Sequence, residues 1–244
     1  MQLMLGRDLV SQQNVYLDAS GSRAVLICGK RGSGKSYTLG VFIEELIAMG
    51  KKDVIPVIID PMGIYHTMVM RNDRQSGELY RWGLPAQSFS VRLLIPGVAR
   101  ELYDHDILDA LKQRGVETVE MRLNPSDLSP DGWCDLFNVN INQPLGIALF
   151  RAVQRLTKTK AEFTIEDIIT TIEDDERAQD VSKEALINRL EAADGWHLFN
   201  VGGYQAMDHI FRPGVVNIVD LSRLESGARG RRNLILSVIG RNLF

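Results

Sequence analysis

Residues 29–36 read GKRGSGKS, a pattern that suits the binding of a phosphate chain. Its glycines let the backbone turn tightly and direct several N–H groups toward one point. Lys35 can reach terminal phosphates as a point charge, and the Ser36 hydroxyl can ligate a magnesium ion that bridges them. The motif G-x-x-x-x-G-K-[ST] is therefore matched in full, with ATP and Mg²⁺ as the expected cofactors. The residues predicted to bind the nucleotide are Gly29, Lys30, Arg31, Gly32, Ser33, Gly34, Lys35, Ser36 and Tyr37.

Phosphoryl chemistry also needs a carboxylate near the metal ion, and two apolar runs end in aspartate. VIPVIID ends at Asp60, and VVNIVD ends at Asp220. A carboxylate at the C-terminal end of a parallel strand faces the crevice where ligands bind. Alternatively, each aspartate only caps the turn after its strand. We favour Asp60 as a metal ligand with Ser36, and as a catalytic residue with Lys35. For Asp220 the two interpretations are equally supported.

The elements around the loop predict an α/β fold of the RecA-like P-loop NTPase class, with a mostly parallel sheet. Residues 23–28 (RAVLIC) and 54–60 are apolar runs typical of buried strands. Residues 36–49 between them carry apolar residues at helical spacing, up to a stop at Gly50. Strand, glycine loop, helix and strand would form one right-handed crossover unit. Further strands are expected at 89–96, 116–124 and 213–222, a short helix within 100–115 and a helix over 231–244, after a polar lead-in over 1–22.

The sequence pattern of residues 125–200 predicts mainly helices. Thr164 and Ser182 are the expected caps of two helices, and the acidic residues 173–176 are expected to form a solvated face. We therefore predict a first part of the core over 1–124, a helical insertion lobe over 125–212 and a return to the core over 213–244. Trp133 is expected to be a packing residue. The cluster of Arg229, Arg231 and Arg232 could contact DNA or a neighbouring subunit, although a solvated helix start is slightly favoured.

Composition excludes several classes of protein. The chain has 244 residues, 45% of them hydrophobic, and its 28 Lys+Arg and 31 Asp+Glu give a net charge of −3. These values argue against a disordered chain and against a wholly basic nucleic-acid binder. Cys28 and Cys134 are far apart and outside any Cys/His cluster, so neither a zinc site nor a disulfide framework is expected. The start, MQLMLGRDLV, has no cationic flank followed by an apolar core, and no run approaches the ~20 apolar residues that cross a bilayer, so we expect a cytoplasmic protein with no membrane partner.

Three blocks of sequence carry a resemblance to a known family. GKRGSGKSYTLG is similar to the P-loop of the HerA–FtsK superfamily of ring-forming, DNA-pumping ATPases. VIIDPMGIY resembles that superfamily's D-x-x-G-E-Y strand end, with Ile64 in place of the glutamate, and NIVDLSRL followed by an apolar helix resembles HerA. The resemblance implies ATP hydrolysis with Mg²⁺ and a homo-hexamer around double-stranded DNA. It also implies a nuclease partner such as NurA, or another effector enzyme.

We interpret the chain as the motor core of a HerA-like DNA translocase or helicase. The family continues after the NIVDLS helix with an acidic strand and an arginine finger. The sequence therefore resembles an incomplete version of the domain, and we expect these 244 residues alone to hydrolyse ATP slowly or not at all and to form rings poorly. A non-hydrolysing nucleotide-binding regulatory module is the alternative, favoured by Ile64 and by the lack of an Asp-Glu pair. A small-molecule kinase is a third possibility, although no arginine-rich lid is evident.

Overall fold

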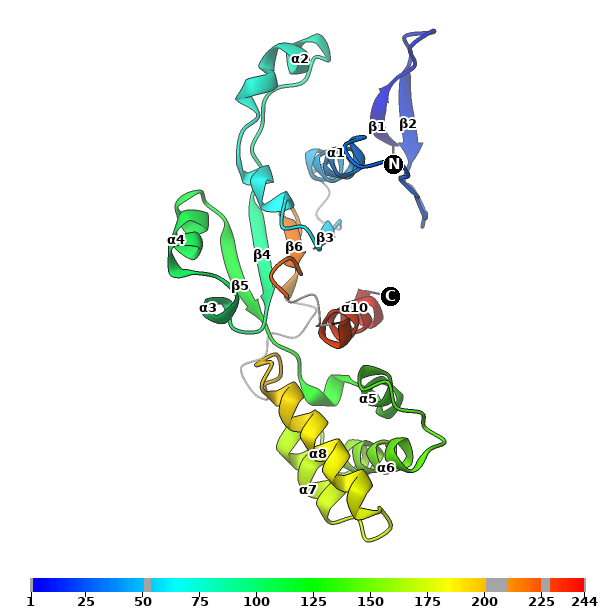
Figure 1. The fold of residues 1–244 in the computed structure, drawn as a ribbon. Helices are drawn as coiled ribbons and strands as arrows, with labels where there is room; N and C mark the ends of the chain where they lie inside the picture. The colour runs from blue at the N-terminus through cyan, green and yellow to red at the C-terminus, as the bar shows by residue number, and fades with distance from the viewer. Residues whose placement is uncertain (1, 51–53, 201–209, 225–228, 244) are drawn as a thin grey trace. The chain divides into compact units, whose positions relative to one another are not determined.

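The computed structural model describes residues 2–50, 54–200, 210–224 and 229–243, and Figure 1 shows how their elements follow one another. The chain divides into two compact units, which are described separately. The first contains Met1–Leu93, Leu108–Thr118 and Phe211–Val219, and the second contains Leu94–Ile107, Val119–Ile210 and Asp220–Phe244. The predicted segment boundaries after residues 124 and 212 stay a prediction.

A four-stranded parallel sheet with surrounding helices confirms the predicted α/β class, and it is consistent with a P-loop NTPase fold. The strand order is β3 (Val57–Asp60), β6 (Val216–Asp220), β4 (Val91–Pro96) and β5 (Glu117–Met121). Every residue of the two inner strands, β6 and β4, is buried. Continuous burial is typical of parallel strands that are covered on both faces, and it explains the unbroken apolar runs in the sequence.

One buried polar side chain fixes the start of the inner strand β6. Asn217 is fully buried, and its amide nitrogen donates to the carbonyl oxygens of Pro56 (3.0 Å) and Arg212 (2.8 Å). Its side-chain oxygen accepts the backbone N–H of Arg212 at 2.9 Å. Because both ends of the buried amide are hydrogen-bonded, Asn217 ties the entry of β6 to the residue that precedes β3.

The prediction of a strand over residues 23–28 is wrong. The segment forms no β-ladder, and the exposed fractions of Val25 and Leu26 are 50% and 86%. A strand needs a neighbour that supplies N–H and C=O groups, and among the described residues none pairs with this run. The predicted strand–loop–helix–strand crossover is therefore reduced to loop, helix and strand.

A β-hairpin occupies the region predicted to be a polar lead-in. β1 (Gln2–Arg7) and β2 (Asn14–Asp18) pair in antiparallel fashion, and the Asp8 carboxylate accepts two backbone N–H groups in the turn between them. Strand β1 packs on helix α1 (Lys35–Ala48), where Leu3 is buried. The backbone N–H of Met4 also donates to a carboxylate oxygen of Glu45 on α1, at 3.2 Å. The hairpin is thus attached to the helix that follows the glycine loop.

The remaining elements agree with most of the sequence expectations. Helix α1 ends before Gly50, which has a left-handed φ of 62° and acts as the predicted stop. The segment between β3 and β4 contains η1 (Tyr65–Val69), η2 (Asp73–Gln75) and α2 (Ser76–Arg81). Between β4 and β5 lie α3 (Ala99–Leu102) and α4 (His105–Gln113).

Helices dominate the second unit, as the sequence predicts. In addition to α3, the described helices of this unit that follow β5 are η3 (Pro125–Asp127), α5 (Pro130–Leu136), α6 (Pro144–Thr159), α7 (Ile165–Glu173), α8 (Asp180–Asp194) and α10 (Arg229–Leu243). Trp133 on α5 is fully buried and stacks on Phe199, with ring centroids 5.4 Å apart. Its indole N–H donates to the carbonyl oxygen of Pro125. These contacts confirm the prediction that Trp133 is a packing residue. On α10 the apolar stripe of Leu234, Ile235, Val238 and Ile239 is buried.

Two helix-start predictions in this unit have different outcomes. Thr164 caps α7 and forms a reciprocal capping box with Asp167, so that prediction is confirmed. Ser182 does not cap α8, which begins earlier, at Asp180. The N–H of Ser182 is already bonded to the carbonyl oxygen of Gln179, and its side chain is buried inside the first helical turn. Of the acidic residues 173–176, all are exposed except Asp175, which is half-buried and paired with Arg151.

Candidate phosphate-binding site

The glycine loop has a backbone conformation that only glycine adopts freely. Gly32 and Gly34 have left-handed φ values of 80° and 86°, and Gly34 is the N-cap residue of α1. At Gly29 an added Cβ would meet the Ser33 hydroxyl, and the Ser33 side chain would have to rotate away. Gly32 and Gly34 therefore meet a geometric need of the loop.

The loop delivers backbone donors at the start of α1. The first intrahelical bond runs from the N–H of Thr38 to the carbonyl oxygen of Gly34, at 2.8 Å. The N–H groups of Lys35, Ser36 and Tyr37 precede that bond and point out of the N-terminal end of the helix. No side-chain cap covers this end, and the helix dipole places partial positive charge there. These donors fit the oxygens of a phosphate chain.

Lys35 and Ser36 supply the side-chain chemistry. The Nζ atom of Lys35 donates to the carbonyl oxygen of Lys30 at 2.8 Å and keeps two further N–H donors. The side chains of Lys30, Arg31 and Ser36 are exposed, and that of Lys35 is half-buried. A serine hydroxyl is the type of oxygen ligand that Mg²⁺ accepts alongside phosphate oxygens. The donor set thus fits Mg·ATP, with Lys35 on the phosphates and Ser36 on the metal ion.

Asp60 lies where the sequence predicts, at the end of β3, and its carboxylate is 1% exposed. Both of its oxygens accept hydrogen bonds from the backbone of its own turn, over residues 62–65. A direct contact between Asp60 and a metal ion stays a prediction.

The turn after Asp60 ends at Tyr65, whose hydroxyl donates to the carbonyl oxygen of Ser36 at 3.1 Å. No role was predicted for Tyr65 from the sequence, although its position in the D-x-x-G-x-Y spacing could have indicated one. The structure therefore joins the end of β3 to the first turn of α1 through this tyrosine.

Asp220 belongs to the second unit, where it is the last residue of β6 and is 3% exposed. Its carboxylate accepts hydrogen bonds from the Tyr103 hydroxyl and, at 2.8 Å, from the backbone N–H of Ser222. The guanidinium of Arg223 lies 5.1 Å from the centroid of the Tyr103 ring. These contacts show how Asp220 is held after its strand, and they leave its role at a metal site a prediction.

The arginines at the start of α10 do not form a solvated cluster, so the favoured interpretation is wrong for the two described side chains. The guanidinium of Arg231 lies 5.3 Å from the centroid of the Trp196 ring, and Arg232 donates to the carbonyl oxygen of Leu224 at 2.6 Å. Both side chains are half-buried because the adjacent helix end and loop supply partners. The side chain of Arg229 lies outside the described residues.

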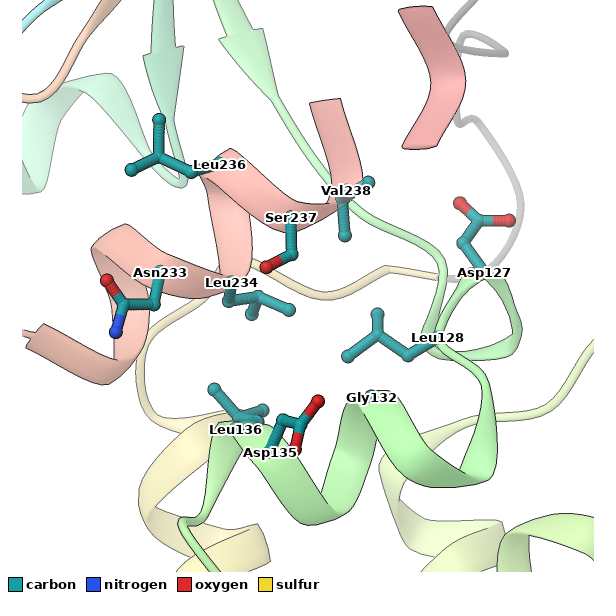
Figure 2. A pocket seen from close by; sticks show the side chains of 10 residues that line it. All are labelled: Asp127, Leu128, Gly132, Asp135, Leu136, Asn233, Leu234, Leu236, Ser237 and Val238. Carbon is teal, nitrogen blue, oxygen red and sulfur yellow. The ribbon is translucent and has the colours of Figure 1, made fainter. Parts of the chain in front are cut away.

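Each unit contains a cavity. In the first unit a cavity of about 760 Å³ starts at Ser36 and Tyr37 and extends along α1, η1 and the segment through residue 74. In the second unit a cavity of about 320 Å³ lies between α5 and α10, and Figure 2 shows Asp135 and Leu136 facing Leu234 and Ser237 across it. Of these two cavities, the one in the first unit includes a residue of the glycine loop, Ser36.

A glycine loop at the N-terminus of a helix, within a parallel α/β fold, defines a P-loop NTPase. The sequence model of the family described as "Helicase HerA, central domain" matches residues 3–243. The chain therefore belongs to the HerA central-domain family, as the resemblance implied. A search of the curated proteins gave no match. Among the described residues, none of the helices is both long enough and apolar enough to span a bilayer.

Proposed function

We propose that the chain is the motor core of a cytoplasmic, HerA-like hexameric translocase that hydrolyses Mg·ATP to move double-stranded DNA, together with a nuclease or another effector protein. Membership of the HerA family supports an ATP-driven motor. The observation that carries the proposal is the geometry of the loop. Left-handed glycines, outward N–H groups and the half-buried Lys35 meet at the N-terminus of α1.

Each part of the loop has a role in this proposal. The N–H groups of residues 35–37 would bind phosphate oxygens, and Lys35 would offset the negative charge of the terminal phosphates. Ser36 would ligate Mg²⁺. The bound Mg·ATP supplies the phosphoryl group whose hydrolysis provides the free energy. Basic side chains of the assembled ring would contact the DNA backbone, so that binding weakens as salt rises.

The test is steady-state ATP turnover with and without linear duplex DNA, combined with sedimentation of the protein. We expect any turnover by the wild-type chain alone to be slow, to rise with DNA and to be lost in Lys35→Ala. Lys158→Ala is the matched control, since Lys158 is an exposed lysine of α6 in the other unit. ATP binding that DNA does not change, without turnover, would contradict the motor. Transfer of phosphate to a metabolite would indicate a kinase instead.

A nucleotide-binding regulatory module is the second candidate, and one observation favours it. Both carboxylate oxygens of Asp60 accept hydrogen bonds from the backbone of its own turn. Ile64 has an exposed apolar side chain at the position where the family motif has glutamate. Neither position therefore offers a carboxylate to activate water. Tight ATP binding without hydrolysis, for the chain alone and with DNA, would support this candidate over the motor.

A further inference from the structure

The carboxylate of Asp60 organises the five residues that follow it. Its Oδ1 atom accepts the backbone N–H groups of Met62 (3.0 Å) and Gly63 (2.8 Å). Its Oδ2 atom accepts those of Ile64 (2.7 Å) and Tyr65 (2.9 Å). An ionised carboxylate has about four lone-pair sites, so this turn uses them all. The chain reverses direction around one buried charge, which the four N–H dipoles stabilise.

The motif spacing follows from this turn. Gly63 has a left-handed φ of 67°, which a residue with a Cβ adopts only with strain. Tyr65 then opens η1 and is buried, with 8% of its surface exposed. Aspartate, glycine and tyrosine at positions 60, 63 and 65 are thus the carboxylate, the left-handed residue and the buried ring of one turn. Ile64 contributes only its backbone N–H to the turn, which explains why the turn forms without a glutamate there.

The hydroxyl of Tyr65 links this turn to the phosphate loop by a hydrogen bond. It donates to the carbonyl oxygen of Ser36, the second residue of α1, at 3.1 Å. The hydroxyl is the donor of this bond, and the backbone carbonyl oxygen is its acceptor. The bond fixes the backbone of the residue whose side chain is the candidate magnesium ligand.

We propose that Asp60 and Tyr65 are positioning residues, which act through the carbonyl oxygen of Ser36 to hold the first turn of α1 in the orientation that ligates the Mg²⁺ of Mg·ATP. This inference rests on the proposed function. It assigns Asp60 a role through Tyr65 rather than through direct contact with the metal ion. It also predicts that the two residues act as one unit.

The first measurement is calorimetric titration with ATP, in Mg²⁺ and in EDTA, for wild type, Tyr65→Phe, Asp60→Asn and the double variant. Tyr65→Phe should weaken binding in Mg²⁺ about fivefold, the effect of one net hydrogen bond, and leave binding in EDTA unchanged. Asp60→Asn should weaken binding in Mg²⁺ by at least as much. The double variant should be no weaker than Asp60→Asn, because both substitutions break the same link. Tyr80→Phe is the matched control, since Tyr80 is 86% exposed.

The second measurement needs no nucleotide. Hydrogen exchange of the Thr38 amide, which is bonded to Gly34 in the first turn of α1, should be about fivefold faster in Tyr65→Phe than in wild type or Tyr80→Phe. Tyr65→Phe decides the question if Asp60→Asn does not fold, because it removes only one hydroxyl.

Two results would overturn the inference. One is exchange and Mg²⁺-dependent affinity in Tyr65→Phe that match the Tyr80→Phe control. The other is a loss of Mg²⁺ dependence in Asp60→Asn with none in Tyr65→Phe, which would make Asp60 a direct metal ligand. A wild-type chain that binds no ATP refutes the proposed function instead. In that case the exchange measurement still shows whether Tyr65 holds the first turn.

Discussion

The Nζ atom of Lys35 lies 2.8 Å from the carbonyl oxygen of Lys30, to which it donates a hydrogen bond. The bond spans the glycine loop and holds the ammonium group beside the backbone donors at the start of α1. Because the loop itself positions the charge, little side-chain freedom remains to be lost when an anion binds. The bond also leaves two ammonium protons for phosphate oxygens.

Replacement of this lysine should therefore weaken the binding of the terminal phosphates more than that of the rest of the nucleotide. We expect Lys35→Ala to weaken ATP binding about a hundredfold, the effect of losing charge-assisted hydrogen bonds. ADP should lose less affinity, since it lacks the γ-phosphate. Calorimetric titration of both nucleotides measures the two losses. Unchanged ATP affinity would show that the loop does not bind the phosphates, and equal losses would place Lys35 away from the γ-phosphate.

Gly63 gives a prediction about stability. Its φ of 67° is required by the turn around Asp60, so Gly63→Ala should lower the free energy of unfolding by roughly 1–2 kcal/mol. Gly77→Ala is the matched control. Gly77 lies in α2 with open space around its Cα and without a left-handed φ, so alanine there should be neutral or stabilising by up to about 1 kcal/mol. Urea unfolding measures both variants. Equal effects at the two positions would show that the left-handed conformation is not needed.

The sequence predicts well those features that depend on local chemistry. The glycine loop, the helix after it, the Gly50 stop and the Thr164 cap follow from backbone rules that act within a few residues. The strands 54–60, 89–96 and 213–222 follow from continuous apolar runs.

Features that depend on distant partners are harder to predict. The run over 23–28 has strand composition, but a strand exists only when a neighbour completes its ladder. The hairpin over residues 2–18 was missed because β1 lacks a clear alternation of apolar and polar residues: Met4 stands between Leu3 and Leu5, and only Leu3 is buried, where β1 packs on α1. At Asp60 the sequence gives the residue type and its place at a strand end. It does not show that four backbone N–H groups occupy the carboxylate.

The two cysteines should differ strongly in reactivity. Burial raises the pKa of Cys134 to about 11, and the charges of Asp131 and Asp135 add to the shift, whereas Cys28 is exposed. A thiol with a raised pKa is protonated at neutral pH, and at pH 8 roughly a thousandth of it would be thiolate. We expect one thiol of the native chain to react rapidly with a disulfide reagent, and both to react after denaturation. Cys28→Ser should remove the rapid phase. Equal rates for the two native thiols would show that α5 does not shield Cys134.

The capping box of α7 links stability to pH. The side chain of Asp167 accepts hydrogen bonds from the Lys160 ammonium (2.6 Å) and the backbone N–H of Thr164 (2.8 Å), and these bonds lower its pKa. Its contribution to the free energy of unfolding is therefore complete above the unfolded pKa, near 4. That contribution is lost as the pH falls through the lower pKa of the folded state.

We expect Thr164→Ala to cost about 1 kcal/mol at pH 7, as the loss of a helix cap does. Asp167→Asn should also destabilise the chain at pH 7, and its difference from wild type should shrink as the pH is lowered below 4, because wild-type Asp167 then becomes protonated. Glu162→Gln is the control, since Glu162 is exposed and precedes the helix. Urea unfolding at pH 7 and at pH 3.5 measures the difference in the free energy of unfolding between each variant and wild type. If the gap between Asp167→Asn and wild type instead widened in acid, the depressed pKa of Asp167 would be wrong, and its bonds to Lys160 and Thr164 would not stabilise the folded state.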